Sequence, residues 1–555
     1  MLAVMSTNGT KKQLEDWSNI QWQKANKLVR NLRQRIFRAR KLGNFKTLRS
    51  LQKLMQRSYA NLLLSVRRIT QTNKGKATAG IDKEIINTPM QRVILVNDWK
   101  GGNLQPARRV EIPKPNGKKR PLGIPTVRDR IEQAIIKNSL EPEWEAVFEP
   151  NSYGFRPGRS CHDAIDQNWK RLNANPKGSR DKWVLEADIK GFFDNIAHES
   201  ILAELVSFPK RSLIEGWLKA GFIFDGKFNQ TEMGTPQGGV ISPLLANIGL
   251  HGLETHLKST NAKLGVVRYA DDFVVTARDK GSLEQAQIQI QEWLSKRGLE
   301  LSTEKTFITS IEEGFDFLGF NHRHYNGKLL IKPSKHKVLD FCKRIGVEIK
   351  AMSAATQEDL ISKLNPILRG FANYYKGGVS SETFNYISHR VWEYLWHWAK
   401  RRHHNKGNEW VRKRYFKTIN GNKWTFACEK GEREDKDKKF NYYLYSIALT
   451  PIERHVKVKG VASPDDPSLK EYWEKRSQKL GKSYWAKGSR NYLIAQNQNW
   501  KCPICGEPLF NGEEIETHHI VLVAQGGLGD ISNLQHLHAP CHKQVHSKSK
   551  SASLK

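Results

Sequence analysis

Acidic residues are scarce in this sequence. Its 555 residues contain 56 Asp and Glu against 91 Lys and Arg, which gives a formal net charge of +35. Such an excess opposes compactness unless a polyanion neutralises it, so nucleic acid is the expected partner and a membrane surface the alternative. No apolar run reaches about 18 residues, so no membrane-spanning helix is expected. The N-terminus lacks the pattern of a secretory signal.

Cysteine is also scarce, and six residues exclude a disulfide-built scaffold. Three of them are scattered and are expected to be buried thiols: Cys161, Cys342 and Cys428. The other three lie close together near the end of the chain, which indicates a metal site in a reducing compartment. The chain is long enough for three or four domains with sizeable cores.

The adjacent carboxylates of Asp271 and Asp272 are flanked by two runs rich in β-forming residues, 266–269 and 273–276. This pattern predicts a β-hairpin with acids at its tip. The two carboxylates repel each other, and Mg²⁺ would neutralise them while leaving room for substrate phosphates. An isolated Asp-Asp pair is more often a solvated turn, so the rest of the chain must decide.

A third carboxylate, Asp188, ends another predicted strand at residues 184–187. It would join Asp271 in holding two ions about 4 Å apart, which activate an attacking 3′-oxygen and stabilise a leaving phosphate. Asp194 is an alternative ligand, although its position before a helical run also suits an N-cap.

Three loops are suited to nucleotide contacts. Residues 108–130 predict a hairpin with a Pro-Asn-Gly turn, whose return strand carries cations for a triphosphate: Lys118, Lys119 and Arg120. The Gly/Pro-rich residues 234–247 open a helix, and Gln237 is available to bond a base or sugar. Residues 151–160 contain two arginines and glycines that would permit close approach to a backbone or template.

Two regions have helical patterns. Residues 11–70 predict helices with an apolar stripe at Leu28, Leu32, Ile36, Leu48, Leu51, Leu54, Met55, Leu62 and Val66. The interleaved cations would contact a phosphate backbone or form an ordinary solvated face: Arg30, Arg33, Arg35, Arg38, Arg40 and Lys41. Residues 330–420 are helical and aromatic, and the stripe Trp392, Leu395, Trp396 and Ala399 predicts a core. Residues 401–490 are highly charged and predict a loosely folded region.

The C-terminal 60 residues contain two ligand pairs with two intervening residues each, Cys502–Cys505 and His538–Cys541, separated by about 32 residues. They would form a closed Cys₃His tetrahedron for Zn²⁺, with His536 as an alternative fourth ligand. So short a module has little core, and a structural ion would help it to fold.

Further histidines lie in and after this segment. His542 and His546 are four residues apart, on one face of a helix, and would bind one catalytic divalent ion together with His518. His519 would deprotonate a water for attack on a phosphodiester. Asn533 would orient His519 by hydrogen bonding.

The ordered motifs DIKGFFD (188–194), PQGGVISPLLAN (236–247) and YADD (269–272) resemble the palm motifs of reverse transcriptases. With TAGID, IPKPNGKKRPLGIPTVRDR, SYGFRPGRS and GFDFLGF they resemble bacterial or organellar group II intron-encoded proteins, which are reverse transcriptase–maturases. This resemblance covers about residues 70–400, and residues 368–375 resemble the family's thumb, or maturase, region. EIETHHIVLVAQGG, NLQHLH and CHKQVH resemble HNH (ββα-metal) endonucleases.

The first resemblance implies roles for individual residues of the polymerase. The implied Mg²⁺ ligands are Asp188, Ile189, Asp271 and Asp272. The implied nucleotide-binding residues are Lys114, Lys118, Arg120, Phe193, Gln237 and Lys305. Phe193 would pack under the sugar and disfavour a 2′-OH. Either Lys114 or Lys118 would reach the triphosphate. Lys305 would lie near the leaving pyrophosphate, or is a surface charge.

The second resemblance implies that His519 is a general base, Asn533 its orienting residue, and His518, His542 and His546 the ligands of a divalent ion. Glu516 is a secondary candidate.

The resemblances together imply a multidomain α+β protein. Its parts would be a right-hand polymerase with an RRM-like antiparallel sheet in the palm, an α-helical thumb or maturase domain, and a zinc-stabilised ββα-metal HNH module. The expected boundaries are a basic helical extension at 1–72, fingers at 73–180, palm at 181–328, thumb at 329–420, a DNA-binding region and linker at 421–494, and the HNH module at 495–555.

The favoured hypothesis is a ribonucleoprotein enzyme that copies RNA into DNA, helps its intron to splice, and nicks target DNA to prime synthesis. The expected partners are group II intron RNA, double-stranded target DNA and dNTPs, in a bacterial cytoplasm or an organelle. The expected cofactors are two Mg²⁺ in the polymerase site, one divalent ion in the HNH site and a structural Zn²⁺. The retained YADD predicts an active polymerase. The alternatives are a splicing-only maturase and a nicking nuclease with a degenerate polymerase.

Overall fold

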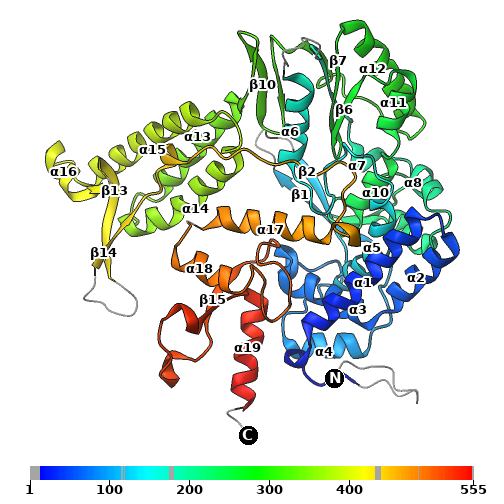
Figure 1. The fold of residues 1–555 in the computed structure, drawn as a ribbon, viewed down its shortest axis with the longest axis horizontal. Helices are drawn as coiled ribbons and strands as arrows, with labels where there is room; N and C mark the ends of the chain where they lie inside the picture. Colours follow the sequence, from blue (N-terminus) through cyan, green and yellow to red (C-terminus); the bar gives the residue numbers. More distant parts are fainter. Residues whose placement is uncertain are drawn as a thin grey trace.

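The computed structural model describes residues 13–113, 117, 119–173, 181–419, 421–431, 439–485 and 487–552. It has mixed α+β architecture, as predicted (Figure 1). A helical arm extends to the left of Figure 1, the central sheets lie at the top, and the C-terminal module lies below, next to the N-terminal helices. Within the described residues, no helix is long and apolar enough to cross a membrane.

The N-terminal helices form one layered group. They are α1 (Trp22–Lys41), α2 (Phe45–Arg57), α3 (Tyr59–Arg67), α4 (Pro89–Asn97) and α5 (Val127–Glu145), and α1, α2 and α3 all contact α5. The predicted helices are present, but the predicted stripe is wrong in two places. Leu28 is 46% exposed because Ala25 and Val29 lie on the face of α1 that turns inward, and Leu54 is 50% exposed because Leu51 and Met55 lie on the inward face of α2.

Several N-terminal cations face the protein itself. Arg33 donates to Asp465 at 2.8 and 2.7 Å and to Glu141 at 2.9 Å. Arg30 and Lys41 form ion pairs with Glu507 and Asp466, respectively. The predicted phosphate contact is therefore wrong for Arg33, which is largely buried.

The central sheet has the strand order β6-β7-β3-β8 and is antiparallel throughout. Its strands are β3 (Trp183–Asp188), β6 (Gly265–Tyr269), β7 (Asp272–Ala277) and β8 (Phe307–Ser310). Successive residues alternate between its faces. Leu185 and Phe273 join the core that includes α12 (Lys280–Ser295), whereas Val184 and Val274 join the core of the helical arm. The sheet is thus buried on both faces.

The remaining elements around this sheet are short. The second sheet, of order β2-β1-β4-β5, consists of β1 (Ala107–Pro113), β2 (Lys119–Ile124), β4 (Phe222–Phe224) and β5 (Lys227–Asn229). The third consists of β9 (Phe315–Phe317), β10 (Phe320–Tyr325) and β11 (Lys328–Pro333). The connecting helices are α6 (Cys161–Leu172), α7 (Phe192–Asn195), α8 (His198–Glu204), α9 (Arg211–Lys219), α10 (Ser242–Gly249) and α11 (Leu253–Thr260).

The predicted basic hairpin is the antiparallel pair β1–β2, in which Ile112 lies opposite Arg120. Lys114 and Lys118, which the resemblance places on a triphosphate, lie outside the described residues.

The helical arm consists of α13 (Lys335–Ala351), α14 (Gln357–Tyr375), α15 (Ser381–Arg402) and α16 (Asn408–Tyr415). The strands β12 (Phe416–Ile419), β13 (Asn422–Gly431) and β14 (Lys439–Tyr443) lie at its outer end. Leu395 and Ala399 are buried, as predicted. Trp392 and Trp396 are only half-buried and line a groove with Trp424, so the predicted core role is wrong for them.

Residues 451–466, which we call the strap, run from this arm back to the N-terminal helices (Figure 1). Asp163 of α6 accepts hydrogen bonds from His455 Nε2 at 2.9 Å and from the Val458 main chain at 2.7 Å. Asp465, near the far end, holds Arg33. The strap leads into α17 (Lys470–Tyr484). The predicted loosely folded region is therefore wrong here, because its charges find buried partners far away in the sequence.

The C-terminal module contains α18 (Arg490–Asn497), the antiparallel strands β15 (Ile515–His519) and β16 (Leu534–His538), and α19 (Ala539–Ala552). This is the predicted ββα order. The module shares a hydrophobic core with the N-terminal helices, in which Trp22 and Val66 belong to the same cluster as Trp500, Leu509 and Leu537.

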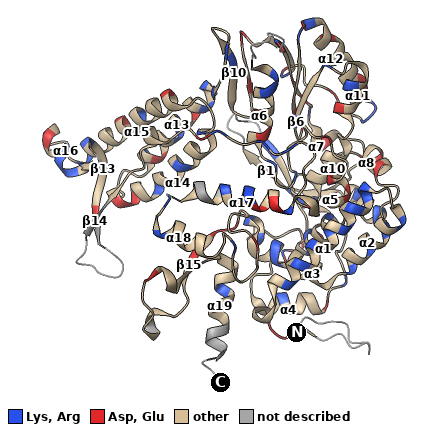
Figure 2. Ribbon diagram, viewed as in Figure 1, with Lys and Arg blue, Asp and Glu red and all other residues tan. Residues whose placement is uncertain are grey.

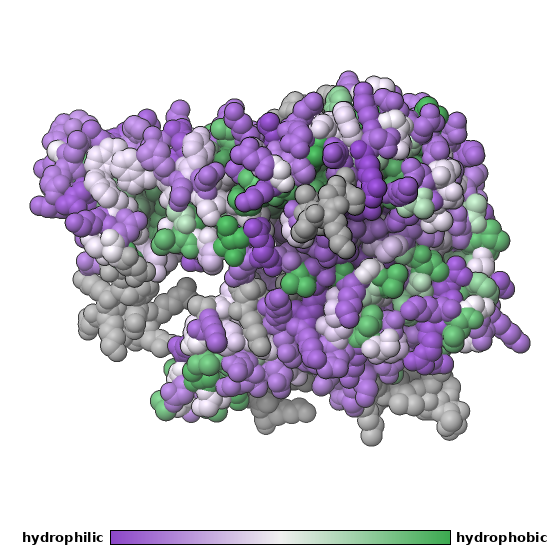
Figure 3. Space-filling model, turned by 45° about the horizontal axis from the view of Figure 1, so that its top comes forward, coloured by the Kyte–Doolittle hydropathy of each residue, from purple (hydrophilic) through white to green (hydrophobic). Residues whose placement is uncertain are grey.

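Lysine and arginine are spread over α1, α2 and α17 (Figure 2). The face shown in Figure 3 is mostly hydrophilic, with separate small hydrophobic patches. Such a surface suits an extended polyanion.

Candidate active sites

Three aspartates meet at one end of the central sheet. Asp188, the last residue of β3, lies directly opposite Asp272, the first residue of β7. Asp271 lies in the turn between β6 and β7, after Ala270, which has a left-handed backbone with φ of 58°. The predicted hairpin is therefore present, and the structure brings all three predicted acids together.

The surroundings of Asp271 and Asp272 raise the pKa of both carboxyl groups. Loss of solvent, together with the charges of Asp271 and Asp188, raises the pKa of Asp272 to about 7, although this residue keeps an exposed edge. Burial and the Asp188 charge also raise the pKa of Asp271. Lys305 Nζ lies 2.7 Å from Asp188 Oδ2 and offsets part of the repulsion.

Asp188, Asp272 and Lys305 line a cavity of about 760 Å³. An all-oxygen donor set with excess negative charge fits Mg²⁺. The Ile189 side chain is apolar and buried, so its main-chain carbonyl is the one ligand atom that this residue offers. Its neighbours make the hydrogen bonds of the bridge to Leu301, from Lys190 N to Glu300 O and from Ser302 N to Asp188 O, so this bridge does not use the Ile189 carbonyl.

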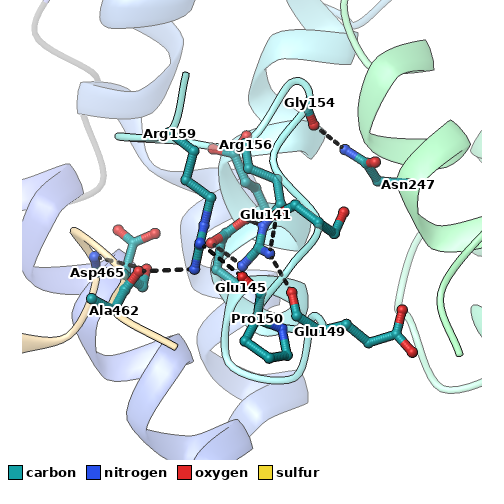
Figure 4. A network of polar contacts seen from close by, with 12 residues as sticks. Glu141, Glu145, Glu149, Pro150, Gly154, Arg156, Arg159, Asn247, Ala462 and Asp465 are labelled. Atoms are coloured by element: carbon teal, nitrogen blue, oxygen red, sulfur yellow. Dashed lines mark hydrogen bonds and ion pairs between the residues drawn. The ribbon is translucent and has the colours of Figure 1, made fainter. Parts of the chain in front are cut away.

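The acidic turn is held by contacts that the sequence analysis did not predict, and Figure 4 shows one of them, between Asn247 and Gly154. Gly154 packs so closely that a Cβ there would overlap the main-chain nitrogen of Ala270. Asn247 donates to the Gly154 carbonyl at 2.8 Å. The buried Arg268 donates to Asn247 Oδ1 at 3.1 Å and to the Ala270 carbonyl at 3.2 Å. In the sequence, the glycine of the SYGF motif is the one residue that indicates such a close contact.

The arginines of residues 151–160 face inward. Arg156 forms a two-pronged ion pair with Glu145, at 2.9 and 3.0 Å (Figure 4). Arg159 donates to main-chain carbonyls of Pro150 and Ala462, the latter on the strap. Gly154 of this loop approaches the main chain of the protein's own acidic turn, whereas the sequence predicted close approach to a nucleic-acid backbone or template.

The predicted nucleotide-binding residues form a neighbouring group. Arg120 Nε donates to Gln237 Oε1 at 2.8 Å, and the Gln237 carbonyl accepts from Gly123 N at 2.7 Å. Thr235 N donates to the Phe193 carbonyl at 2.7 Å, which fixes this loop against α7. Phe193 and Gln237 both line a cavity of about 240 Å³.

Asp194 lines the smaller cavity beside Phe193, whereas Asp188 and Asp272 line the larger one. It lies inside α7, and the N-cap of α8 is Ala197. The N-cap interpretation of Asp194 is therefore wrong.

In the C-terminal module, the ligand atoms of four predicted residues lie within 4.8 Å of one another: Cys502, Cys505, His538 and Cys541. His538 Nε2 donates to the carbonyls of Pro508 and Leu509, each at 3.2 Å, which leaves Nδ1 facing Cys505 Sγ at 3.3 Å. Fixing one ring nitrogen in this way orients the other towards a metal. The set fits Zn²⁺.

The alternative ligand His536 lies elsewhere. Its Nδ1 contacts Thr517 Oγ1 at 3.1 Å, its Nε2 contacts the Asn491 carbonyl at 3.0 Å, and its ring stacks on Trp485. Both nitrogens are engaged, so His536 is excluded from the cluster.

The charge of the cluster also favours a cation. Burial alone would lower the pKa of the His538 imidazole, but hydrogen bonds to the sulfurs of Cys502 and Cys541 raise it to about 10. Sulfurs that stabilise a proton this strongly provide the negative environment that a metal ion needs.

A second cluster contains His518, His542 and His546. His542 Nε2 lies 3.1 Å from His518 Nδ1 and 2.9 Å from His546 Nε2. The carboxylate of Glu516 accepts from His542 Nδ1, which leaves Nε2 free to bind a metal. Three converging nitrogens fit one divalent transition-metal ion.

His519 and His518 alternate along β15 and therefore point to opposite faces of the hairpin. His519 Nε2 is buried and has no hydrogen-bond partner within the described residues. Asn533 does not make the expected bond to His519. Its side chain bonds to the main chain of Val521 at 2.8 and 3.1 Å and of Leu528 at 2.8 Å, and so holds the loop between β15 and β16.

Four family models match the chain. They are "N-terminal domain of reverse transcriptase" over residues 17–99, "Reverse transcriptase (RNA-dependent DNA polymerase)" over 112–322, "Group II intron, maturase-specific domain" over 340–416, and "HNH endonuclease" over 502–548. These matches define the class: an RNA-directed DNA polymerase that also carries a maturase domain and a DNA endonuclease domain.

Relatives narrow the class to a family. The group II intron-encoded protein LtrA of Lactococcus lactis is 31% identical over 57% of this chain and 69% of its own length. The protein YkfC of Escherichia coli is 36% identical over 46% of this chain and 79% of its own length. A 91 kDa protein in the cob intron of Schizosaccharomyces pombe is 30% identical over 55% and 48%, respectively. The chain belongs to the group II intron-encoded proteins, as the sequence motifs predicted.

Proposed function

We propose that this protein binds its group II intron RNA, copies it into DNA, and nicks target DNA to create the primer for that copying. The observation that carries the proposal is the meeting of Asp188, Asp271 and Asp272 at one end of the central sheet, where Asp188 and Asp272 line one cavity with Lys305. We also propose the division into fingers at 73–180, palm at 181–328, thumb at 329–420, linker and DNA-binding region at 421–494, and nuclease at 495–555.

In the polymerase site, the three aspartates and the Ile189 carbonyl would hold two Mg²⁺, which when bound activate the 3′-oxygen and neutralise the leaving phosphate. Lys305, which pairs with Asp188 in the absence of substrate, would turn to the leaving pyrophosphate. Negative charge would build up on the pyrophosphate as it leaves, and the flexible Lys305 ammonium would pair with that charge as it does with Asp188.

The incoming nucleotide would lie between the acids and the Arg120–Gln237 pair. The guanidinium would bind the triphosphate in a bidentate manner, while Gln237 bonds the base or sugar. Phe193 would exclude a 2′-OH by its bulk. Lys114 and Lys118 remain predicted triphosphate contacts.

In the nuclease, His518, His542 and His546 would hold one divalent ion, which when bound stabilises charge on the scissile phosphate. Glu516 would fix the His542 ring by accepting from Nδ1. His519 would take the proton from the attacking water. Asn533 would act indirectly by holding the loop that follows His519. The Cys502, Cys505, His538 and Cys541 site would hold structural Zn²⁺.

Intron RNA would contact the helical arm at the aromatic groove of about 680 Å³. Trp392 and Trp396 are nearly parallel, with an interplanar angle of 12°, and Trp424 meets both edge-on. Trp392 Nε1 is an unpaired donor within the described part of the chain. Partly exposed aromatic rings of this kind stack unpaired bases. Arg369, which lies 5.3 Å from the centre of the Tyr445 ring in the same groove, would be available for a phosphate.

Primer extension on poly(rA)/oligo(dT) with Mg²⁺ tests the polymerase. Asp271→Ala should abolish extension, whereas Asp279→Ala, an exposed acid that caps α12, should leave it intact. An unmutated protein that binds intron RNA without extending the primer would support the splicing-only maturase instead. Nicking without extension, lost in His519→Ala, would support the nuclease alternative.

A further inference from the structure

Arg67 joins the first helices of the chain to the metal cluster at its end. It is the last residue of α3 and is 5% exposed. Its Nη2 donates to Cys541 Sγ at 3.0 Å, across 474 residues of sequence. Its guanidinium lies 4.6 Å from the centre of the Trp22 ring and 3.8 Å from Glu513 Oε2.

The charge of Arg67 matches the metal site. Three thiolates and a neutral imidazole around Zn²⁺ carry a net charge of about −1. A buried charge is tolerated only beside an opposite charge with hydrogen bonds. Arg67 supplies one positive charge and a hydrogen bond to a ligating sulfur. The Glu513 carboxylate, which is partly exposed, is the more distant partner.

Other N-terminal groups contact the segments that the metal would hold in place. Asn26 Nδ2 donates to the Cys505 carbonyl at 3.0 Å, inside the first ligand pair. Gln544 of α19, which follows the second ligand pair, donates to the carbonyls of Ser18 and Ile20 at 2.6 and 3.0 Å. Both sides of the cluster are therefore attached to the N-terminal helices.

We propose that the Cys₃His metal centre, besides stabilising its own module, is the contact that docks the nuclease onto the N-terminal helices, with Arg67 as its counter-ion. This inference rests on the proposed zinc site. The metal holds the 502–505 turn next to residues 538–541, and these are the segments that Arg67 and Asn26 contact. Zinc binding and docking therefore strengthen each other, because coupling between two binding events is reciprocal.

The test uses full-length protein with Arg67→Met, Arg67→Lys and a matched control, Arg30→Met. Arg30 lies in the same interface, where it pairs with Glu507 at the surface and does not touch the cluster. The first readout is the rate of zinc transfer to a chromogenic chelator. We expect about a tenfold or greater acceleration in Arg67→Met, as for other residues that support metal ligands. We expect partial rescue in Arg67→Lys and no change in Arg30→Met.

The second readout is docking, measured as protease cleavage between α17 and α18. Arg67→Met should raise the cleavage rate and Arg30→Met should not. If Arg67→Met does not fold, hydrogen exchange is measured on unmutated protein before and after chelation. Loss of protection in α1 and α3 as well as α19 supports the docking role, and unchanged protection in α1 and α3 overturns it.

The two proposals fail in different ways. Unmutated protein that purifies without zinc overturns the zinc site and the docking role together. Zinc-loaded protein in which Arg67→Met behaves like Arg30→Met overturns the docking role alone. DNA nicking is not a readout in either case.

Discussion

At the scale of single residues, the polymerase site is electrostatically unfavourable without cations. Asp272 lies opposite Asp188 and next to Asp271, and its pKa is raised to about 7. The Lys305 ammonium, 2.7 Å from Asp188 Oδ2, offsets part of the repulsion among the three carboxylates. Such a site has a stability cost that divalent cations relieve, as at many functional sites.

Asp272→Asn should remove activity and slightly stabilise the cation-free protein. The rate of extension should fall by roughly a hundredfold or more, since several kcal/mol of metal-assisted catalysis are lost. With divalent ions chelated, the thermal midpoint at pH 8 should rise by about 1–2 °C, a small value because the group is partly exposed.

The size of this stabilising effect of Asp272→Asn depends on pH. A folded-state pKa of about 7 exceeds the ordinary value of about 3.9. The protonated carboxyl therefore contributes stability below about pH 4, and that contribution is lost as pH rises through 7. The advantage of Asp272→Asn should be largest at pH 8 and vanish towards pH 4. An equal advantage at both values would contradict the raised pKa.

Phe193→Ala should relax sugar selection. Phe193 lines the cavity beside Gln237, and removing its ring opens space for a 2′-OH. Incorporation of rNTPs relative to dNTPs should increase about 10- to 100-fold in single-nucleotide extension assays. Phe155→Ala, which removes the ring that meets Phe193 edge-on at 6.4 Å, is the comparison, and an equal increase there would assign selection to the pair.

At the scale of elements, the acidic turn depends on a loop more than 100 residues earlier in the chain. Gly154→Ala would push the added methyl group against the main chain of Ala270. Extension should fall about tenfold or more, because small displacements of reacting groups are costly, while DNA nicking stays unchanged. Gly370→Ala, in a helix with open space around it, should keep full extension.

The aromatic groove makes the helical arm a candidate for base stacking. Trp424 is 43% exposed on β13. Trp424→Ala should weaken intron RNA binding about 5- to 100-fold in filter-binding assays, while the salt dependence stays the same because no phosphate contact is lost. Trp410→Ala, an exposed tryptophan outside the groove, should bind as the unmutated protein does.

At the scale of the whole molecule, the strap connects the arm, the polymerase core and the N-terminal helices. Burial alone would raise the pKa of Asp163, but hydrogen bonds from His455 and Val458 hold it below its usual value. A depressed carboxylate pKa contributes stability above about pH 4 that is lost as pH falls through the folded value. The strap should therefore stay docked at neutral pH.

Asp163→Asn should weaken the docking free energy of the strap by about 3 kcal/mol, since it removes the carboxylate charge that its buried partners pair with. Limited proteolysis at pH 7 should show faster cleavage within residues 451–466. Asp166→Asn, one turn along α6 and paired with Lys170 at the surface, should cleave at the unmutated rate. Equal cleavage in both variants would show that Asp163 does not anchor the strap.

Local patterns account for what could be predicted. The hairpin at Asp271 and Asp272, the strand ending at Asp188 and the ββα order of the nuclease follow from short-range periodicity and motif order. Ligand spacing in Cys502–Cys505 and His538–Cys541 likewise depends on neighbouring residues. Leu28 and Trp396 were misjudged because helical spacing shows that a stripe exists, while its exact orientation depends on what packs against it.

The sequence by itself determined the family, the enzymatic class and the residues of both clusters, because each is written in a local motif. Only the tertiary structure decided where the charges go. Arg33 pairs with Asp465 across 432 residues, and Arg67 meets Cys541 across 474. An arginine can pair with any acid or thiolate that the fold brings near, so these partners depend on the folding free energy of the whole chain. The same basic residues that predicted nucleic acid binding thus also hold the polymerase and nuclease parts together.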